Sequence, residues 1–323
     1  MKSRITTAAI GAVAIAALAG CSSAGGGAPA GEEGAFEPSD VRMTVPFSAG
    51  GGSDASGRAI ASGLEAATGT TITVENREGG SGAVGYSHLF AQEGNGSQLL
   101  AAETTLLSLP LTTDVDYDHT SFTPIMKLGD DYTLVVVPAD SPFQTCTDVV
   151  DAAGGEGVVA AVSGAISLDE IVFTLIEQDQ GVEFDRVPFE SGSEVIAGLL
   201  GGTVQVGSLN PGEVLGQLES GDLRALCSLS EERYEYEQIA DVPTAIEEGI
   251  DVSFAQWRGF IAPGGISDEA RQYWIDAAEQ YVASEEYTTY IEENLMQPNA
   301  VYGDEFVEYL AQNSADLEAA LAP

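Results

Sequence analysis

The residues best suited to chemistry in this chain lie in two glycine-rich loops, each directly after a hydrophobic, strand-like stretch. The first loop follows Val41 to Val45 and runs into an amphipathic helix, and the second follows Ile72 to Asn76. Such turns leave backbone N–H groups bare at the positive end of a helix, where they attract an anion. The two glycine-rich loops together predict a binding site for one anion between them. The candidate ligand-binding residues are Ser48, Ala49, Gly50, Gly51, Gly52, Ser53 and Asp54 in the first loop and Gly79, Gly80, Ser81 and Gly82 in the second.

Nucleotide binding is not expected at these loops. Neither loop is followed by the Lys-Ser or Lys-Thr pair of a P-loop, and GGGSDASG lacks the third glycine at the spacing that dinucleotide-binding folds use. Each loop taken alone is equally typical of a plain turn.

The sequence predicts a binding protein rather than an enzyme. It has no GxSxG elbow and no cysteine with a histidine partner in a recognisable frame, and its acids are so abundant that carboxylate pairs arise by chance. His88 and His119 lie far apart with no Cys or His at ligand spacing, so neither a metal nor a cofactor is expected. A surface scaffold or adhesin would show repeats, and the chain has no internal period.

The N-terminus predicts export and a lipid anchor. Lys2 and Arg4 precede an apolar run from Ile5 to Ala19, which is shorter than the roughly 20 residues that span a bilayer. The run closes on Leu18-Ala19-Gly20-Cys21, which resembles a bacterial lipobox and implies that Cys21 becomes the lipidated end of the mature chain. An ordinary signal peptide with an accidental cysteine is the alternative. We expect an extracytoplasmic protein, lipid-anchored to the outer face of the bacterial cell membrane.

Residues 22–37 are mostly Gly, Ala, Ser and Pro with acidic residues, which is typical of a flexible linker. Beyond the signal the chain is very acidic, with 51 Asp and Glu against 11 Lys and Arg overall and a net charge of -40. Such a surface repels nucleic acid and anionic headgroups, so neither is a predicted partner. The charge indicates adaptation to concentrated salt, with a merely acidic proteome as the alternative.

Cys146 and Cys227 are the remaining cysteines, and they are a candidate disulfide pair in an oxidising compartment. Two buried thiols are the alternative, and the sequence does not decide between them.

Strand-like and helix-like segments alternate, which predicts an α/β fold with mostly parallel sheets. The roughly 300 residues beyond the signal exceed what one core usually serves, which favours two lobes. Expected strands are 41–45, 71–74, 98–102, 133–137, 158–161, 184–187, 204–208, 223–228 and 256–262, and expected helices are 54–68, 168–178, 193–201, 213–220 and three near the end.

Two apparent crossings, near residues 137–142 and 252–259, indicate a middle lobe inserted between the halves of an outer lobe. The expected organisation is a signal at 1–21, a linker at 22–37, a first lobe from 38–137 and 255–323, and a second lobe from 138–254. Ligands of open α/β sheets bind outside the carboxyl ends of the strands, so the cleft between such lobes is the expected binding place.

The chain from about Val41 onward resembles the periplasmic solute-binding proteins of the tripartite tricarboxylate transporters, the Bug receptors. The matching segments, in order along the chain, are Val45 to Ala61, Val74 to Gly85, Val187 to Gly207, Gly221 to Arg233, Asp241 to Gly249 and Trp257 to Glu269.

The resemblance implies a two-lobed periplasmic-binding-protein-like fold of type II. The lobes would close on a small organic acid, and the protein would hand it to the membrane permease subunits. In this family backbone amides and waters hold the carboxylate, so the resemblance assigns the two glycine loops to that role. Asp54 would cap the first helix or hold a ligand amine. We expect a monomer. The second lobe would contribute Ser163, Gly164, Ala165, Ser167, Phe189, Ser191 and Gly192.

Three departures from the family pattern leave the ligand's identity open. Phe189 stands where a tyrosine is common, Glu78 brings a carboxylate into the second loop, and Arg58 follows glycine rather than alanine. A solute receptor of another transport system, for phosphate or amino acids, is the alternative function.

Overall fold

The computed structural model describes residues 36–162, 168–189 and 191–321. The predicted signal and the lipidation site Cys21 lie outside these residues, as do most of the linker and the candidate ligand residues Ser163, Gly164, Ala165 and Ser167. Within the described ranges, no helix combines the length and apolar character needed to cross a membrane.

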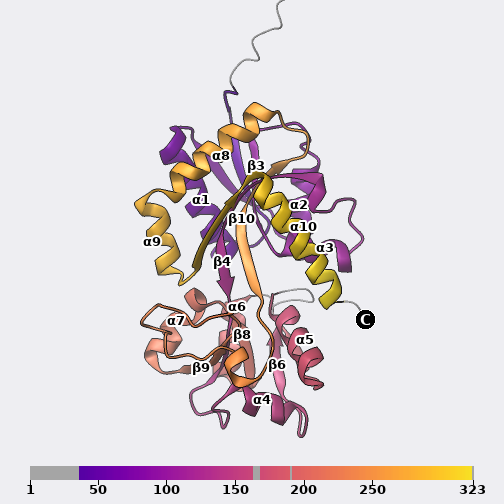
Figure 1. Ribbon diagram of the computed structural model, residues 1–323, viewed down its shortest axis with the longest axis vertical. Helices are drawn as coiled ribbons and strands as arrows, with labels where there is room; N and C mark the ends of the chain where they lie inside the picture. The colour runs from indigo at the N-terminus through magenta and orange to yellow at the C-terminus, as the bar shows by residue number, and fades with distance from the viewer. Residues whose placement is uncertain (1–35, 163–167, 190, 322–323) are drawn as a thin grey trace, which may run out of the picture. The chain divides into compact units, whose positions relative to one another are not determined.

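Over the described residues, the first sheet has six strands in the order β11-β4-β10-β3-β1-β2. Its strands β4, β10 and β3 are labelled in Figure 1. β1 pairs in parallel with β2 and β3, while β10 is antiparallel to β3 and β4, and β11 is antiparallel to β4. The strands are β1 (Val41–Val45), β2 (Ile72–Asn76), β3 (Gln98–Glu103), β4 (Phe122–Tyr132), β10 (Ala255–Pro263) and β11 (Gln297–Tyr302).

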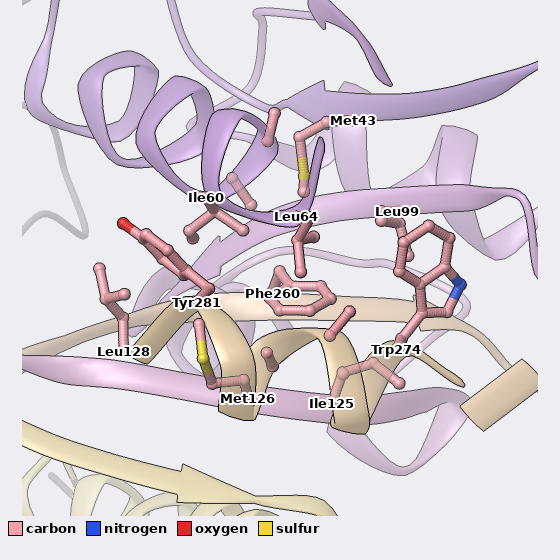
Figure 2. Packing of buried hydrophobic residues seen from close by; sticks show 14 of the residues in the cluster. Met43, Ile60, Leu64, Leu99, Ile125, Met126, Leu128, Phe260, Trp274 and Tyr281 are labelled. Atoms are coloured by element: carbon pink, nitrogen blue, oxygen red, sulfur yellow. The ribbon is translucent and has the colours of Figure 1, made fainter. Parts of the chain in front are cut away.

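Apolar helix faces cover the first sheet. Ile60 and Leu64 of one helix and Trp274 and Tyr281 of another pack with Phe260 in a single fully buried core (Figure 2). The two helices approach closely because Gly63 has no side chain: a Cβ there would lie 2.0 Å from the Tyr281 ring. The helices of this part are α1 (Gly52–Thr68), α2 (Ala83–Phe90), α3 (Thr105–Thr112), the 3₁₀ turn η1 (His119–Ser121), α8 (Asp268–Val282), α9 (Glu285–Glu293) and α10 (Gly303–Ala320).

The second sheet, again over the described residues, has five strands in the order β7-β6-β8-β5-β9. β6 is parallel to β7 and β8, whereas β5 is antiparallel to β8 and β9. The strands are β5 (Leu134–Pro138), β6 (Val159–Val162), β7 (Asp185–Pro188), β8 (Val206–Leu209) and β9 (Leu223–Ser228). The helices are α4 (Cys146–Ala153), α5 (Leu168–Gln180), α6 (Gly192–Leu200), α7 (Pro211–Ser220) and the 3₁₀ turn η2 (Ile246–Glu248). The two-lobed α/β fold with an inserted middle lobe is therefore confirmed.

The pairing of β5 corrects one expected element. The strand expected at 133–137 was assigned to the first lobe, but β5 pairs only within the second sheet, through Val135 with Ser208 and Cys227. The chain therefore leaves the first sheet at the end of β4, at Tyr132, and not at the prolines that follow Val137. It returns with β10, which begins at Ala255. The expectation of mostly parallel sheets was also too strong, because β4, β5, β10 and β11 pair antiparallel.

A disulfide joins Cys146 at the start of α4 to Cys227 in β9, with their Cα atoms 5.9 Å apart. Both residues are buried in the core of the second sheet. The bond ties a helix to an outer strand of that sheet.

Lys127 is fully buried in β4. Its ammonium lies 2.7 Å from the carboxylate of Asp130 and 4.3 Å from the centre of the Tyr309 ring in α10. Asn299 of β11 donates a hydrogen bond to the same carboxylate at 2.7 Å. The charge is therefore paired and stacked against an aromatic face, as a buried ammonium requires.

Candidate functional site

The first glycine loop connects β1 to α1. The N-cap of α1 is Gly51, and no side chain caps the helix there. The first N–H groups of an α-helix have no partner inside the helix, so this start presents bare donors. Gly50 has a φ of +89°, a conformation that glycine adopts without strain. The local geometry has the form expected of an anion cradle.

Asp54 closes this loop and does not cap the helix. Its buried carboxylate accepts hydrogen bonds from the N–H of Gly50 at 3.0 Å, from Nε of Arg58 at 3.0 Å and from Nδ2 of Asn76 at 2.9 Å. Burial opposes ionisation, but these hydrogen bonds outweigh it and hold the pKa of Asp54 below its ordinary value. The carboxylate thus fixes the loop to both α1 and β2.

The second loop lies directly beside the first because β1 and β2 pair in parallel, with Val45 opposite Asn76. Arg77 donates its N–H to the carbonyl of Val45 at 2.8 Å. Ser48 Oγ donates to the carboxylate of Glu78, so the glutamate that departs from the family pattern links the two loops.

The second loop has a left-handed backbone throughout its glycine segment. Gly79, Gly80, Ser81 and Gly82 have φ values of +131°, +59°, +53° and +96°. Gly82 is the N-cap of α2 and no side chain caps that helix either. Three of these positions accept the conformation because they carry no Cβ.

In the second lobe, the described candidates are Phe189, Ser191 and Gly192, at the start of α6. Ser191 is the N-cap, and its hydroxyl accepts the N–H of Glu194 at 3.4 Å. The half-buried ring of Phe189 packs over Gly198, where a Cβ would lie 2.7 Å from the ring. Ser191 and Phe189 therefore have local structural partners, and Gly192 is the candidate that faces another element.

A buried cluster of charged side chains lies outside the residues predicted from the sequence to form the site. Arg258 in β10 lies with Nη1 3.2 Å from Glu103 and with Nε 2.9 Å from Asp131. All three side chains are at most 7% exposed. Desolvation opposes the charge on Arg258, but Asp131 and Glu103 raise the pKa of its guanidinium, which keeps its proton. Burial raises the pKa of Asp131, against the pull of Arg258.

Next to this cluster is a cavity of about 20 Å³, enough for about one water molecule. Its walls come from α1, β4, β10 and α9 of the first lobe and from the start of α7 of the second. The lining residues are Gly52, Asp131, Asn210, Gly212, Glu213, Arg258, Tyr290 and Asn294. Of the predicted site residues that the structure describes, only Gly52 lines it.

Glu213 places a carboxylate between the starts of two helices. A Cβ on Gly52 of α1 would lie 3.4 Å from Oε1 of Glu213, and a Cβ on Gly192 of α6 would lie 2.8 Å from its Oε2. The residue as a whole is exposed, but its carboxyl end lies in this crowded region. Loss of water there raises the pKa of Glu213 to about 7, against the opposing charge of Arg258.

The family comparison supports the expected receptor class. The model of the tripartite tricarboxylate transporter family receptor, TctC, matches residues 57–321. Among curated relatives, a UPF0065 protein of Cupriavidus necator is 26% identical over 86% of this chain and 85% of its own length. The protein BugT of Bordetella pertussis is 27% identical over 70% of this chain and 71% of its own length.

Solved structures share the fold. A TctC solute-binding protein from Polaromonas has a TM-score of 0.71 and 26% identity, covering 87% of this chain and 97% of its own. An R. palustris protein solved with adipate has a TM-score of 0.79 and 22% identity, and the match covers 87% of this chain and 95% of that protein. MatC of Rhodopseudomonas palustris, solved with malate, has a TM-score of 0.76 and 20% identity, and the match covers 87% of this chain and 98% of MatC. The chain belongs to the tripartite tricarboxylate transporter receptors, the TctC or Bug family of solute-binding proteins.

Proposed function

We propose that this chain is an extracytoplasmic solute-binding lipoprotein that captures a small carboxylic acid between its lobes and delivers it to a tripartite tricarboxylate transporter. The carrying observation is the pair of adjoining glycine loops, each leading into a helix that no side chain caps. The N–H groups at the start of α1 have no partner inside the helix and suit a carboxylate group. At the start of α2, Ala83 and Val84 already donate to the carbonyls of Gly80 and Gly79. Binding of adipate and malate by proteins of the same fold supports this ligand class.

The ligand carboxylate would lie at Gly51, Gly52 and Ser53 and would be shared with the second loop through Gly79 to Gly82. Asp54 and Glu78 act on the loops themselves: Asp54 holds the first loop to its helix, and Glu78 links the two. Gly192 and the segment 163–167 would complete the site from the second lobe.

A thermal-shift screen tests this function. Di- and tricarboxylic acids, with and without amino groups, are compared with inorganic phosphate and with amino acids whose side chains lack a carboxylate. A ligand at 100 times its Kd stabilises the fold by about 2.7 kcal/mol, so the melting temperature should rise with its concentration. A shift with a di- or tricarboxylic acid supports the proposal. A shift with phosphate alone, or with the simple amino acids alone, would favour a receptor of another transport system.

The lipid anchor is tested separately at Cys21. The mature wild-type protein should carry a diacylglyceryl mass at its N-terminal cysteine and partition into detergent. Cys21→Ala should appear in the water phase without that mass. Recovery of the same lipid on the Cys21→Ala variant would contradict the anchor and leave the binding function intact.

A further inference from the structure

We propose that the cavity beside Arg258 is an amine subsite, so that the captured acid carries a primary ammonium group next to a carboxylate. This inference rests on the proposed function and specifies its ligand class. The ammonium would lie between Asp131 and Glu213, and the carboxylate would bind the N–H groups at the start of α1.

The first observation is an unpartnered acceptor. Asp131 is 5% exposed at its side chain, and Nε of Arg258 lies 2.9 Å from its Oδ2. Its other oxygen, Oδ1, is buried and has no hydrogen-bond partner among the described residues, and Asp131 lines the cavity. A buried carboxylate oxygen without a donor costs free energy, which a donor entering the cavity recovers.

The second observation is the balance of charge. Two carboxylates, of Asp131 and Glu213, line the cavity with one cation, Arg258. Arg258 already forms ion pairs with Asp131 and with Glu103 behind it. Glu213 forms no ion pair within the described part of the chain. Where it is ionised, its carboxylate adds a negative charge that Arg258, already paired twice, offsets only in part. A ligand cation here gains attraction from both acids, whereas a second ligand carboxylate would be repelled.

The third observation is the size of the cavity and its position beside the start of α1. The cavity of about 20 Å³ takes a group the size of a water molecule, and a primary ammonium matches this size and offers three donors. Gly52, the first residue of α1, forms one wall. A carboxylate at this helix start and an ammonium in the cavity would therefore be close enough to belong to one amino acid.

Glu213 makes the subsite sensitive to pH. Loss of water raises the pKa of Glu213 to about 7, so the group that would face the ammonium is fully ionised only above that pH. An amino acid should then bind more tightly at pH 8 than at pH 6. The charged and titratable groups around the carboxyl are Arg258 of β10, Asp131 of β4, Glu103 of β3, Asp169 of α5 and, across the cavity, Tyr290 of α9.

Isothermal titration calorimetry on the mature chain tests the subsite with matched acids. The probes are succinate, malate and aspartate, which share one skeleton, and glutarate and glutamate, which share another. At pH 8 we expect at least one amino acid to bind about tenfold or more tightly than its partner without nitrogen. Glu213→Gln should remove most of that preference and its pH dependence while leaving the binding of succinate or glutarate equal or tighter. Glu219→Gln, an exposed glutamate on the same helix, is the matched control and should behave as wild type.

Each other result overturns the inference. Succinate or glutarate binding as tightly as its amino partner removes the amine subsite but leaves the carboxylate receptor intact. Malate binding within threefold of aspartate shows that a neutral donor suffices. An equal loss of both ligand types in Glu213→Gln shows a structural role only. Failure of every acid in both this titration and the thermal screen would overturn the proposed function as well.

Discussion

Nε of Arg258 lies 2.9 Å from Oδ2 of Asp131, and this buried ion pair joins the start of β10, where the chain returns to the first sheet, to the end of β4, where it leaves. Glu103 of β3 pairs with the same guanidinium. One arginine thus pairs with two carboxylates that the sheet order brings together, and the cavity lies beside this cluster.

Replacing Arg258 by Gln should destabilise the fold strongly, because Glu103 and Asp131 would remain buried without a cation. Removing one partner of a buried pair costs about 3–5 kcal/mol. Arg42, half exposed and paired with Glu75, is the control, and Arg42→Gln should cost at most about 1 kcal/mol. Equal urea midpoints for the two variants would contradict the importance of the buried cluster.

Asp54→Ala should both loosen the first loop and weaken ligand binding. The variant leaves the Gly50 N–H, Arg58 and Asn76 without their shared acceptor, which should cost about 1–3 kcal/mol of stability. Chemical denaturation gives that loss, and the thermal screen gives the affinity. Asp268→Ala, an exposed acid in the first turn of α8, should change stability by less than about 1 kcal/mol. A ligand shift in Asp54→Ala as large as in wild type would show that the loop does not need this carboxylate.

The raised pKa of Glu213 predicts how stability depends on pH. The folded state binds the carboxyl proton of Glu213 more tightly than the unfolded chain does. The protonated carboxyl therefore costs the fold nothing at low pH, and the fold loses free energy of unfolding as this group ionises near pH 7. Glu213→Gln should therefore raise the melting temperature at pH 8 and not at pH 5. Allowing for solvent screening, we expect about 1 kcal/mol, or about 2 °C for a chain of this size. An equal gain at both pH values would show that charge is not the cause.

The Cys146–Cys227 bond should protect both thiols in the mature protein. Alkylation without reduction should label neither residue, and intact mass will show this directly. Reduction, or a double Cys→Ser variant, should cost about 3–5 kcal/mol because the bond closes a long loop. Two labelled thiols in the unreduced native protein would contradict the bond.

Salt should stabilise the protein, since a net charge of -40 repels itself in the compact state. The Debye length falls from about 10 Å at 0.1 M to about 3 Å at 1 M, which screens that repulsion. The melting temperature should therefore rise between 0.1 M and 1 M potassium chloride. A melting temperature that stays constant or falls with salt would show that repulsion among the acidic residues does not limit the stability of the fold.

The alternation of strands and helices was sufficient to predict an α/β fold, because local apolar patterns determine the elements, whereas the sheets were expected to be more parallel than they are. The strand expected at 41–45 is β1, and those expected at 98–102 and 223–228 are β3 and β9 to within one residue. β4 was missed because its Pro124, Lys127 and paired aspartates look like a loop. The buried Lys127 is paired with Asp130, which lies beside it only in the folded strand, and its ammonium also contacts the Tyr309 ring.

The glycine loops could be predicted as neighbours, since adjoining parallel strands end at the same edge. The cavity could not. Glu103, Asp131 and Arg258 are far apart in the sequence and meet only because β4, β10 and β3 are adjacent. An arginine within the apolar strand from Trp257 to Ile261 was the one local signal. The anion that the loops would hold stays a prediction.

The burial of Lys127 gives the folded chain a built-in reporter of unfolding. It is the single lysine after Lys2, and its amine is both fully buried and paired with Asp130. An amine-reactive ester should therefore leave the peptide containing Lys127 unmodified as long as β4 stays in place. The rate at which that peptide acquires the label should measure how often the first sheet opens, with no engineered probe.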